Sequence, residues 1–268
     1  MVTNKPSISL LIATYNWPEA LNLCLASVLN QRLMPDEIII ADDGSRAETT
    51  DLIESFRSKF SIPLIHVWQE DNGFQLSKIR NKAIAKASKE YIVQVDGDLI
   101  LEENFIADHA RFAQTGTFVS GTRVQMSDAL SKKLIAEQRT AVSVFSKGIT
   151  NFSNGLRSYP ASTFLASRYK AKQMTYVRGC NMAFWRKDLL NVNGYNEAIV
   201  GWGREDSELA IRLINSGIRK RILKFGAVVF HIYHPEAQRN QLSINDAILS
   251  DTITNQVKTC KTGLSQYL

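Results

Sequence analysis

Short apolar runs alternate with segments of helical spacing in the first part of this chain. The runs, which are typical of buried β-strands, lie at 7–13, 37–41, 64–68 and 91–96. A first helix is predicted after Pro18, where Leu21, Leu25 and Val28 share a face. A second is predicted between the strand at 37–41 and Phe60, and a third over about 76–87. This alternation is typical of βαβ units, so the sequence predicts an α/β fold with a mostly parallel sheet.

Three of the predicted strands end in hydroxyl, amide or carboxylate side chains. These are Thr14, Tyr15 and Asn16 after the first strand, Asp42 and Asp43 after the second, and Asp96 and Asp98 after the fourth. Ligands of open α/β sheets bind at the carboxyl ends of the strands, so we expect these groups to share one crevice. Two acids separated by one glycine also occur in solvated turns, but their convergence with the other groups favours a divalent metal site that neutralises a pyrophosphate.

The second half of the chain is less regular. The stretch 126–175 is mostly polar with mixed helical and loop signals, and regular spacing returns over 177–185. Since no linker rich in proline and glycine bounds this stretch, we interpret it as an insertion packed on the same domain.

A glycine-flanked tryptophan, Trp202, precedes a predicted helix that begins with Glu205 and Asp206 and ends near Gly217. Acids in a first helical turn have a purely structural explanation, because they interact favourably with the helix dipole. The glycines on both sides of Trp202 cost conformational entropy that a capping motif does not require. They favour a functional turn on which the indole is a flat platform for a sugar ring.

Two histidines, His231 and His234, follow a strand-like stretch at 227–230. Histidines in this position usually have a structural role. A metal ion at the acidic pair would however need a further protein ligand, and neutral imidazole is a common one. The other histidines, His66 and His109, lie within a predicted strand and on a helix face.

The chain has 268 residues, of which 44% are hydrophobic, and this is enough for one large α/β domain. Its apolar runs are too short for a membrane helix or a secretory signal, so we expect cytoplasmic residence. The three cysteines, Cys24, Cys180 and Cys260, are far apart in sequence, and we interpret them as structural.

The net charge of +6 comes partly from basic runs at 168–172 and 219–224. Such runs are commonly solvated faces, and no zinc-finger or RNA-recognition motif accompanies them, so nucleic acid is disfavoured as a partner. The partner that this charge favours is an anionic membrane, which the protein would contact at its surface. Apolar residues of the tail 241–268 show imperfect helical spacing. Packing on the core is the preferred interpretation of the tail, and dimerisation and lipid contact are the alternatives.

The motifs in this order resemble family 2 glycosyltransferases of the GT-A fold. They are Thr14-Tyr15-Asn16, Asp42-Asp43-Gly44-Ser45, Arg80-Asn81, Asp96-Gly97-Asp98 and the segment from Gly201 to Asp206. Asn72-Gly-Phe-Gln-Leu and Trp-Gly-x-Glu-Asp are most similar to bacterial chondroitin polymerase domains and β1,4-galactosyltransferases. The resemblance extends to about Arg239.

The resemblance implies a Rossmann-like, mostly parallel sheet flanked by helices, with a C-terminal acceptor-binding part. It divides the chain into a nucleotide-sugar-binding half at 1–125, an acceptor-binding and catalytic half of the same domain at 126–240, and the tail at 241–268. A UDP-sugar is expected to contact Ala13, Thr14, Tyr15, Asn16, Asp43, Arg80 and Asp96. Mn²⁺ or Mg²⁺ is expected at Asp98, Asp96 and His231, with His234 as the alternative to His231.

The acceptor side follows from the same resemblance. Asp206 matches the catalytic base, Glu205 an acid that assists catalysis and binds the acceptor, and Trp202 with Gly203 the acceptor platform. Gly97 departs from the pattern, since larger residues are frequent between the two acids.

The expected activity is inverting, metal-dependent transfer of a hexose or N-acetylhexosamine from a UDP-sugar. The acceptor is a glycan or lipid-linked glycan of the cell-surface polysaccharide or lipopolysaccharide type, and the product is a β-glycoside. Two alternatives stay open, a non-catalytic UDP-sugar-binding protein and a nucleotidyltransferase. The first strand is followed by Thr-Tyr-Asn-Trp-Pro rather than a phosphate-binding glycine-rich loop, which disfavours the nucleotidyltransferase. The sequence fixes neither the donor sugar nor the oligomeric state.

Overall fold

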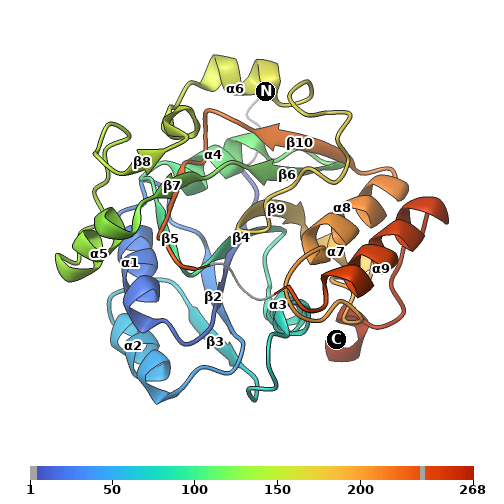
Figure 1. Ribbon diagram of the computed structural model, residues 1–268, viewed down its shortest axis with the longest axis horizontal. Helices are drawn as coiled ribbons and strands as arrows, with labels where there is room; N and C mark the ends of the chain where they lie inside the picture. The colour runs from blue at the N-terminus through green and yellow to red at the C-terminus, as the bar shows by residue number, and fades with distance from the viewer. Residues whose placement is uncertain (1–4, 236–238) are drawn as a thin grey trace.

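The computed structural model describes residues 5–235 and 239–268, and its core is a seven-stranded sheet flanked by helices (Figure 1). The strand order is β10-β6-β9-β4-β1-β2-β3. The bounds are β1 Ile8–Thr14, β2 Glu37–Asp42, β3 Leu64–Trp68, β4 Tyr91–Asp96, β6 Thr117–Gly121, β9 Asn181–Trp185 and β10 Arg219–Leu223. All neighbours are parallel except β9, which runs antiparallel to β4 and β6. The predicted mostly parallel sheet is therefore confirmed.

The helices cover both faces of this sheet because side chains alternate along each strand. Leu10 and Ile12 of β1 pack in the same core as α1 and α2, whereas Leu11 and Ala13 pack in the core of α3 and α8. The helix bounds are α1 Pro18–Leu29, α2 Ala47–Arg57, α3 Leu76–Lys86, α4 Phe105–Phe112, α5 Asp128–Ala136, α6 Tyr159–Leu165, α7 Arg186–Asn191, α8 Glu205–Asn215 and α9 Leu242–Thr254. Among the described residues, no helix is both long and apolar enough to cross a membrane.

A second sheet of short strands lies beside the first, in the order β5-β11-β7-β8. Its strands are β5 Leu99–Leu101, β7 Val124–Met126, β8 Ile149–Thr150 and β11 Val229–His231. Only β11 had a counterpart among the predicted strands, since two or three residues are too few to show a period. The pairing of β11 with β5 sets His231 opposite Leu99, next to Asp98.

Two boundaries differ from the sequence prediction. The segment 177–185 is regular only from Asn181, and the residues before it form turns. The acidic pair is divided between elements, because β4 ends at Asp96 while Asp98 lies in the turn before β5. The three cysteines are buried and unbridged, which confirms their structural interpretation.

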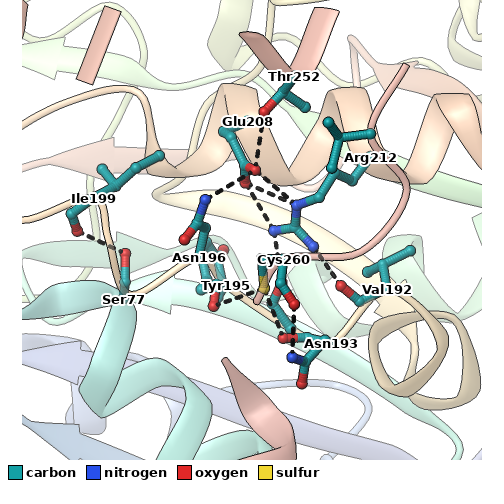
Figure 2. A network of polar contacts seen from close by, with 12 residues as sticks. Ser77, Val192, Asn193, Tyr195, Asn196, Ile199, Glu208, Arg212, Thr252 and Cys260 are labelled. Carbon is teal, nitrogen blue, oxygen red and sulfur yellow. Dashed lines mark hydrogen bonds and ion pairs between the residues drawn. The ribbon is translucent and has the colours of Figure 1, made fainter. Parts of the chain in front are cut away.

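A buried ion pair within α8 is hydrogen-bonded to other segments of the C-terminal half (Figure 2). Glu208 and Arg212 are separated by one helical turn and are almost fully buried, with Nη2 to Oε2 at 2.8 Å. Arg212 also donates to the carbonyl oxygens of Val192 and Gly194, and Thr252 of α9 donates to Glu208. The tail therefore packs on the core through α9, as expected.

His109 of α4 is fully buried and is a hydrogen-bond partner of Asn181 through Nε2, at 3.0 Å. Its Nδ1 has no partner in the described part of the chain, and burial lowers the pKa of His109 to about 4. The folded state therefore binds fewer protons than the unfolded state between pH 4 and pH 6.5, and its stability falls as the pH falls through this window.

We expect His109 to contribute about 2 to 3 kcal/mol of destabilisation between pH 7 and pH 4.5. Urea unfolding at both pH values measures this change, with His109→Gln as the comparison, because glutamine can donate to Asn181 without titrating. An equal loss of stability in both proteins would contradict this assignment.

Candidate active site

The carboxyl ends of β1, β2 and β4 meet at one edge of the sheet, as the sequence predicts. Ala13 of β1 is paired with Ala41 of β2 on one side and with Asp96 of β4 on the other. The Gly97 backbone amide donates to the Ala13 carbonyl oxygen at 2.7 Å. The loop after β1 is held to the loop after β2 because the Asn16 amide donates to Ser45 Oγ at 2.8 Å. The first two polar clusters therefore form one wall.

The predicted nucleotide-binding side chains line this wall. Thr14 is nearly buried, while the Tyr15 ring is half exposed and its hydroxyl donates to Asp71 at 2.9 Å. Asp43 is buried and accepts hydrogen bonds from the Gln69 side chain and from the backbone amide of Gln75. Burial raises the pKa of Asp43 above its ordinary value, although both hydrogen bonds oppose this shift.

Three possible metal ligands, Asp98, His231 and His234, come together at the second sheet. One ligand atom from each lies within 4.8 Å of the others. Asp98 Oδ2 is 3.5 Å from His231 Nε2 and 3.2 Å from His234 Nε2. Their proximity follows from the β5–β11 register and from the Ile232 amide, which donates to the Asp98 carbonyl oxygen.

The chemistry of these groups suits a divalent cation. Among the residues that the structure describes, the buried Asp98 Oδ1 has no hydrogen-bond partner, so it is an unused acceptor. Burial lowers the pKa of His231, which favours the neutral imidazole that a metal requires, while the hydrogen bond to Asp98 raises the pKa of His234. The structure brings both histidines to Asp98, whereas sequence analysis treated them as alternatives.

Asp96, the other expected metal ligand, pairs with Arg80 instead of joining this cluster. Arg80 is almost completely buried, with Nη2 at 3.0 Å from Asp96 and Nη1 at 2.9 Å from Asp206. Glu205 is a third carboxylate near Nη1, at 3.7 Å. Since both Nη atoms are engaged, Arg80 lies among the acids and holds them together.

Glu205 and Asp206 begin α8, after Arg204 in the left-handed conformation with φ of 79°. Asp206 Oδ1 accepts from Arg80 and from the hydroxyl of Tyr195, at 3.3 Å. Burial, and then the charge of Asp206, raise the pKa of Glu205 to about 8. This shift favours the protonated form of Glu205, so Asp206 is the stronger candidate for the base.

The turn around Trp202 is fixed by α9. Gly201 and Gly203 have φ of 74° and 101°, conformations that favour glycine. Asn245 of α9 donates to the carbonyl oxygens of Val200 and Gly203. The Trp202 indole is 38% exposed, and the guanidinium of Arg239 lies over one of its faces, 4.7 Å from the ring centroid.

Sequence reasoning missed Gly179 and Tyr195, which support Asp206 from other elements. A Cβ on Gly179 would lie 1.6 Å from Asp206 Oδ2, so only glycine fits beneath the carboxylate. Tyr195 is buried, and its hydroxyl, which has one proton, lies 2.9 Å from Gln94 Oε1 and 3.3 Å from Asp206 Oδ1. No local motif signals either contact, because the partners are far apart in sequence.

Gly179→Ala is expected to displace the Asp206 carboxylate and to lower the turnover number by about a hundredfold, since small misplacements of reacting groups have effects of this size. Steady-state kinetics measure the loss, and calorimetric UDP affinity is the control because Gly179 is away from the β1–β2 wall. Wild-type turnover in the variant would show that the position of this carboxylate is unimportant.

Comparison with known proteins gives two matching family models. The model for glycosyl transferase family 2 matches residues 9–192, which is most of the chain. A model for the N-terminal domain of galactosyltransferase matches residues 160–235 and includes Trp202, Asp206 and both histidines of the cluster.

Individual proteins are similar over nearly the whole chain. Chondroitin synthase from Escherichia coli is 28% identical over 248 residues, covering 87% of this chain and 36% of that protein. TarS of S. aureus, residues 1–349 in complex with UDP-GlcNAc, has a TM-score of 0.63 at 16% identity and covers 97% of this chain and 69% of its own. The mannosyltransferase PcManGT from Pyrobaculum calidifontis, in complex with GDP-Man and Mn²⁺, has a TM-score of 0.63 at 19% identity, covering 97% and 66%.

The chain spans only about a quarter to a third of the chondroitin and hyaluronan synthases that it matches. The structural neighbours have the GT-A fold, so the fold class expected from the sequence is confirmed.

Proposed function

This chain belongs to glycosyl transferase family 2, and from that premise we propose that it is an inverting, metal-dependent enzyme that uses a UDP-sugar. It is a glycosyltransferase with relatives in polysaccharide synthesis. The sugar moved is a hexose or N-acetylhexosamine, the acceptor is a glycan or lipid-linked glycan of the cell-surface type, and the product is a β-glycoside.

The observation that carries the proposal is the position of Arg80. Its guanidinium joins Asp96, at the end of β4, to Asp206, at the start of α8. The wall formed by β1 and β2 and the turn of Trp202 therefore belong to one site. Arg80 is assigned a positioning role, because each of its Nη atoms contacts a carboxylate of the site, and the diphosphate contact expected from the sequence stays a prediction.

The residues at the second sheet fit a bound cation. Asp98, His231 and His234 would hold it, and two imidazoles favour Mn²⁺ over Mg²⁺, which prefers oxygen ligands. A cation there supplies Lewis acidity toward the diphosphate of the leaving nucleotide. The PcManGT complex with Mn²⁺ supports this assignment by analogy of fold.

The acceptor side follows from the geometry of Asp206. Its Oδ1 is held by Arg80 and Tyr195, so Oδ2 is the oxygen that takes the proton of the acceptor hydroxyl. The raised pKa of Glu205 favours its protonated form, so the role of base is assigned to Asp206. Trp202 orients the acceptor ring by stacking. One base and one direct displacement give inversion at the anomeric carbon.

Hydrolysis of a panel of UDP-sugars tests the proposal, with UDP release followed in the presence of Mn²⁺ and then of EDTA. We expect one or two UDP-sugars to be hydrolysed, and EDTA to stop the reaction. Metal-independent hydrolysis would contradict the metal assignment. Binding of UDP-sugars without release under any condition would favour the non-catalytic alternative.

The proposal includes peripheral contact with an anionic membrane. Large apolar side chains are exposed between residues 145 and 174, namely Phe145, Phe152, Leu156, Tyr159, Phe164 and Met174. Basic residues are interleaved with them, namely Lys147, Arg168, Lys170 and Lys172. This combination suits an interface between lipid headgroups and chains. Co-sedimentation with phosphatidylglycerol vesicles but not with phosphatidylcholine vesicles is the expected result, and equal behaviour with both would refute membrane contact through charge.

A further inference from the structure

Helix α9 of the tail lies alongside α8 (Figure 1) and contacts the turn that carries Trp202, yet it is outside both matched family models. These models end at residues 192 and 235, and α9 begins at Leu242. A Cβ on Gly203 would lie 3.3 Å from Leu242 Cδ1, so the start of α9 packs closely against the turn. The family match therefore gives α9 no role, and its contacts with this turn are the guide to one.

The side chain of Asn245 bridges the two sides of Trp202. Asn245 is 1% exposed, and its Nδ2 donates to the carbonyl oxygen of Val200 at 3.1 Å and to that of Gly203 at 3.0 Å. The nitrogen of a side-chain amide has two protons, so it can make both hydrogen bonds at once. One side chain of α9 therefore holds the backbone before and after the indole.

The turn needs this support from outside because its own conformation is unfavourable. Gly201, Gly203 and Arg204 have φ of 74°, 101° and 79°. For Arg204, which has a Cβ, a left-handed conformation is strained, and such residues persist only where the surrounding structure holds them. The side chains of Val200 and Trp202 are exposed, so packing contributes little to holding the turn.

Two further contacts hold the ends of the turn. The Gly201 amide donates to the carbonyl oxygen of Phe74 at 3.1 Å, before Trp202. After Trp202, Arg204 Nε lies 2.5 Å from Asp246 Oδ1 of α9, but both side chains of this ion pair are largely exposed, and exposed pairs contribute little. The buried amide of Asn245 is therefore the stronger connection between α9 and the turn.

We infer that Asn245 is a positioning residue for the acceptor, so that the acceptor-binding part of the enzyme includes α9, beyond the boundary at residue 240 that the sequence suggested. The inference rests on the proposed function, because it takes Trp202 as the surface on which the acceptor ring stacks. Asn245 acts through Trp202, whose indole it holds near Asp206 at the start of α8. Loss of its two hydrogen bonds should weaken acceptor binding and leave the nucleotide on the β1–β2 wall unaffected.

Fluorine NMR of protein labelled with 5-fluorotryptophan tests whether Asn245 positions the turn. The chain has four tryptophans, and Trp202→Phe identifies the signal of Trp202. Asn245→Leu removes both donors with a side chain of similar size, and Asn245→Asp replaces the amide nitrogen by an acceptor. With UDP and Mn²⁺ bound, we expect one sharp Trp202 signal in the wild type and a shifted or broadened one in both variants. The other three signals should stay unchanged, which shows that the fold is intact.

Titration with acceptor analogues, followed by the same Trp202 signal, measures the effect on binding. The probes are the p-nitrophenyl β-glycosides of glucose, galactose and N-acetylglucosamine. At least one probe is expected to shift the wild-type signal and to bind Asn245→Leu about 10 to 100 times more weakly, the effect of two lost hydrogen bonds. Calorimetric UDP affinity in the presence of Mn²⁺ should stay within about threefold of wild type.

Asn215, the last residue of α8, offers a matched control. Its Nδ2 also donates to two carbonyl oxygens of the tail, those of Thr252 and Val257. Asn215→Leu removes the same kind of connection at the end of α8 opposite to Trp202, and it should keep the wild-type Trp202 signal and glycoside affinity.

An unchanged Trp202 signal in both Asn245 variants, or equal effects of Asn245→Leu and Asn215→Leu, would overturn the inference. A fall in UDP affinity as large as the fall in glycoside affinity would overturn it too, because Asn245 would then support the whole site. Failure of the proposed acceptor site is distinguishable from these results, since the wild-type Trp202 signal would then respond to no glycoside although UDP binds.

Discussion

Asp206→Asn is expected to lower the turnover number of sugar transfer by about 10² to 10⁴, the usual contribution of a general base. Asparagine has the same shape, so its Oδ1 can still accept from Arg80 and Tyr195, as Asp206 does. Its amide nitrogen takes the place of Oδ2 and cannot take a proton from the acceptor. UDP affinity is expected to stay within about threefold of wild type, because the contacts on the β1–β2 wall are unchanged.

Glu205→Gln is the matched control one residue away. Burial raises the pKa of Glu205 to about 8, so glutamine resembles the protonated form that this shift favours. We expect less than about a tenfold loss of turnover, the size of one neutral hydrogen bond. Equal losses in both variants, or full turnover in Asp206→Asn, would remove Asp206 from the role of base.

Arg212→Met is expected to lower the free energy of unfolding by about 3 to 5 kcal/mol, because it leaves Glu208 charged, buried and without its partner. The carbonyl oxygens of Val192 and Gly194 lose their donor as well (Figure 2). Urea unfolding measures the change. This loss is a large part of the stability of a typical domain.

Two further variants separate the buried charge from the lost packing. Adding Glu208→Gln to Arg212→Met removes the unpaired charge, so we expect the double variant to be more stable than Arg212→Met alone. Lys132→Met breaks an exposed pair with Asp128 of the same helical spacing and should cost less than about 1 kcal/mol. A similar cost for Arg212→Met and Lys132→Met would show that burial of the pair is unimportant.

The sheet and its strand-end groups could be predicted because each strand of this part carries its own signal. The runs that become β1, β2 and β4 are mostly apolar, and each ends at polar side chains of the site. Polar groups at the ends of parallel strands meet whatever the detailed packing is, so the convergence of Ala13 and Asp96 followed from topology alone.

The remaining contacts of the site depend on pairings that leave no local pattern. The register of β11 with β5, a three-residue match, decides that both histidines reach Asp98. Arg80 and Asp206 are 126 positions apart, and only the finished fold shows that they pair. Glu208 and Arg212 look like an ordinary surface pair in the sequence, and their burial follows from the packing of α9 and the 192–196 segment on α8.

Calorimetric titration of UDP into the protein, with Mn²⁺ and then with EDTA, tests most directly whether Asp98 and its two histidines hold the cation that the nucleotide needs. We predict that UDP affinity falls at least tenfold with EDTA, about the lower limit for losing a group that only supports a metal ligand. The same fall is predicted for Asp98→Asn in the presence of Mn²⁺. UDP affinity that is the same with and without Mn²⁺, or that is unchanged in Asp98→Asn, would contradict the account.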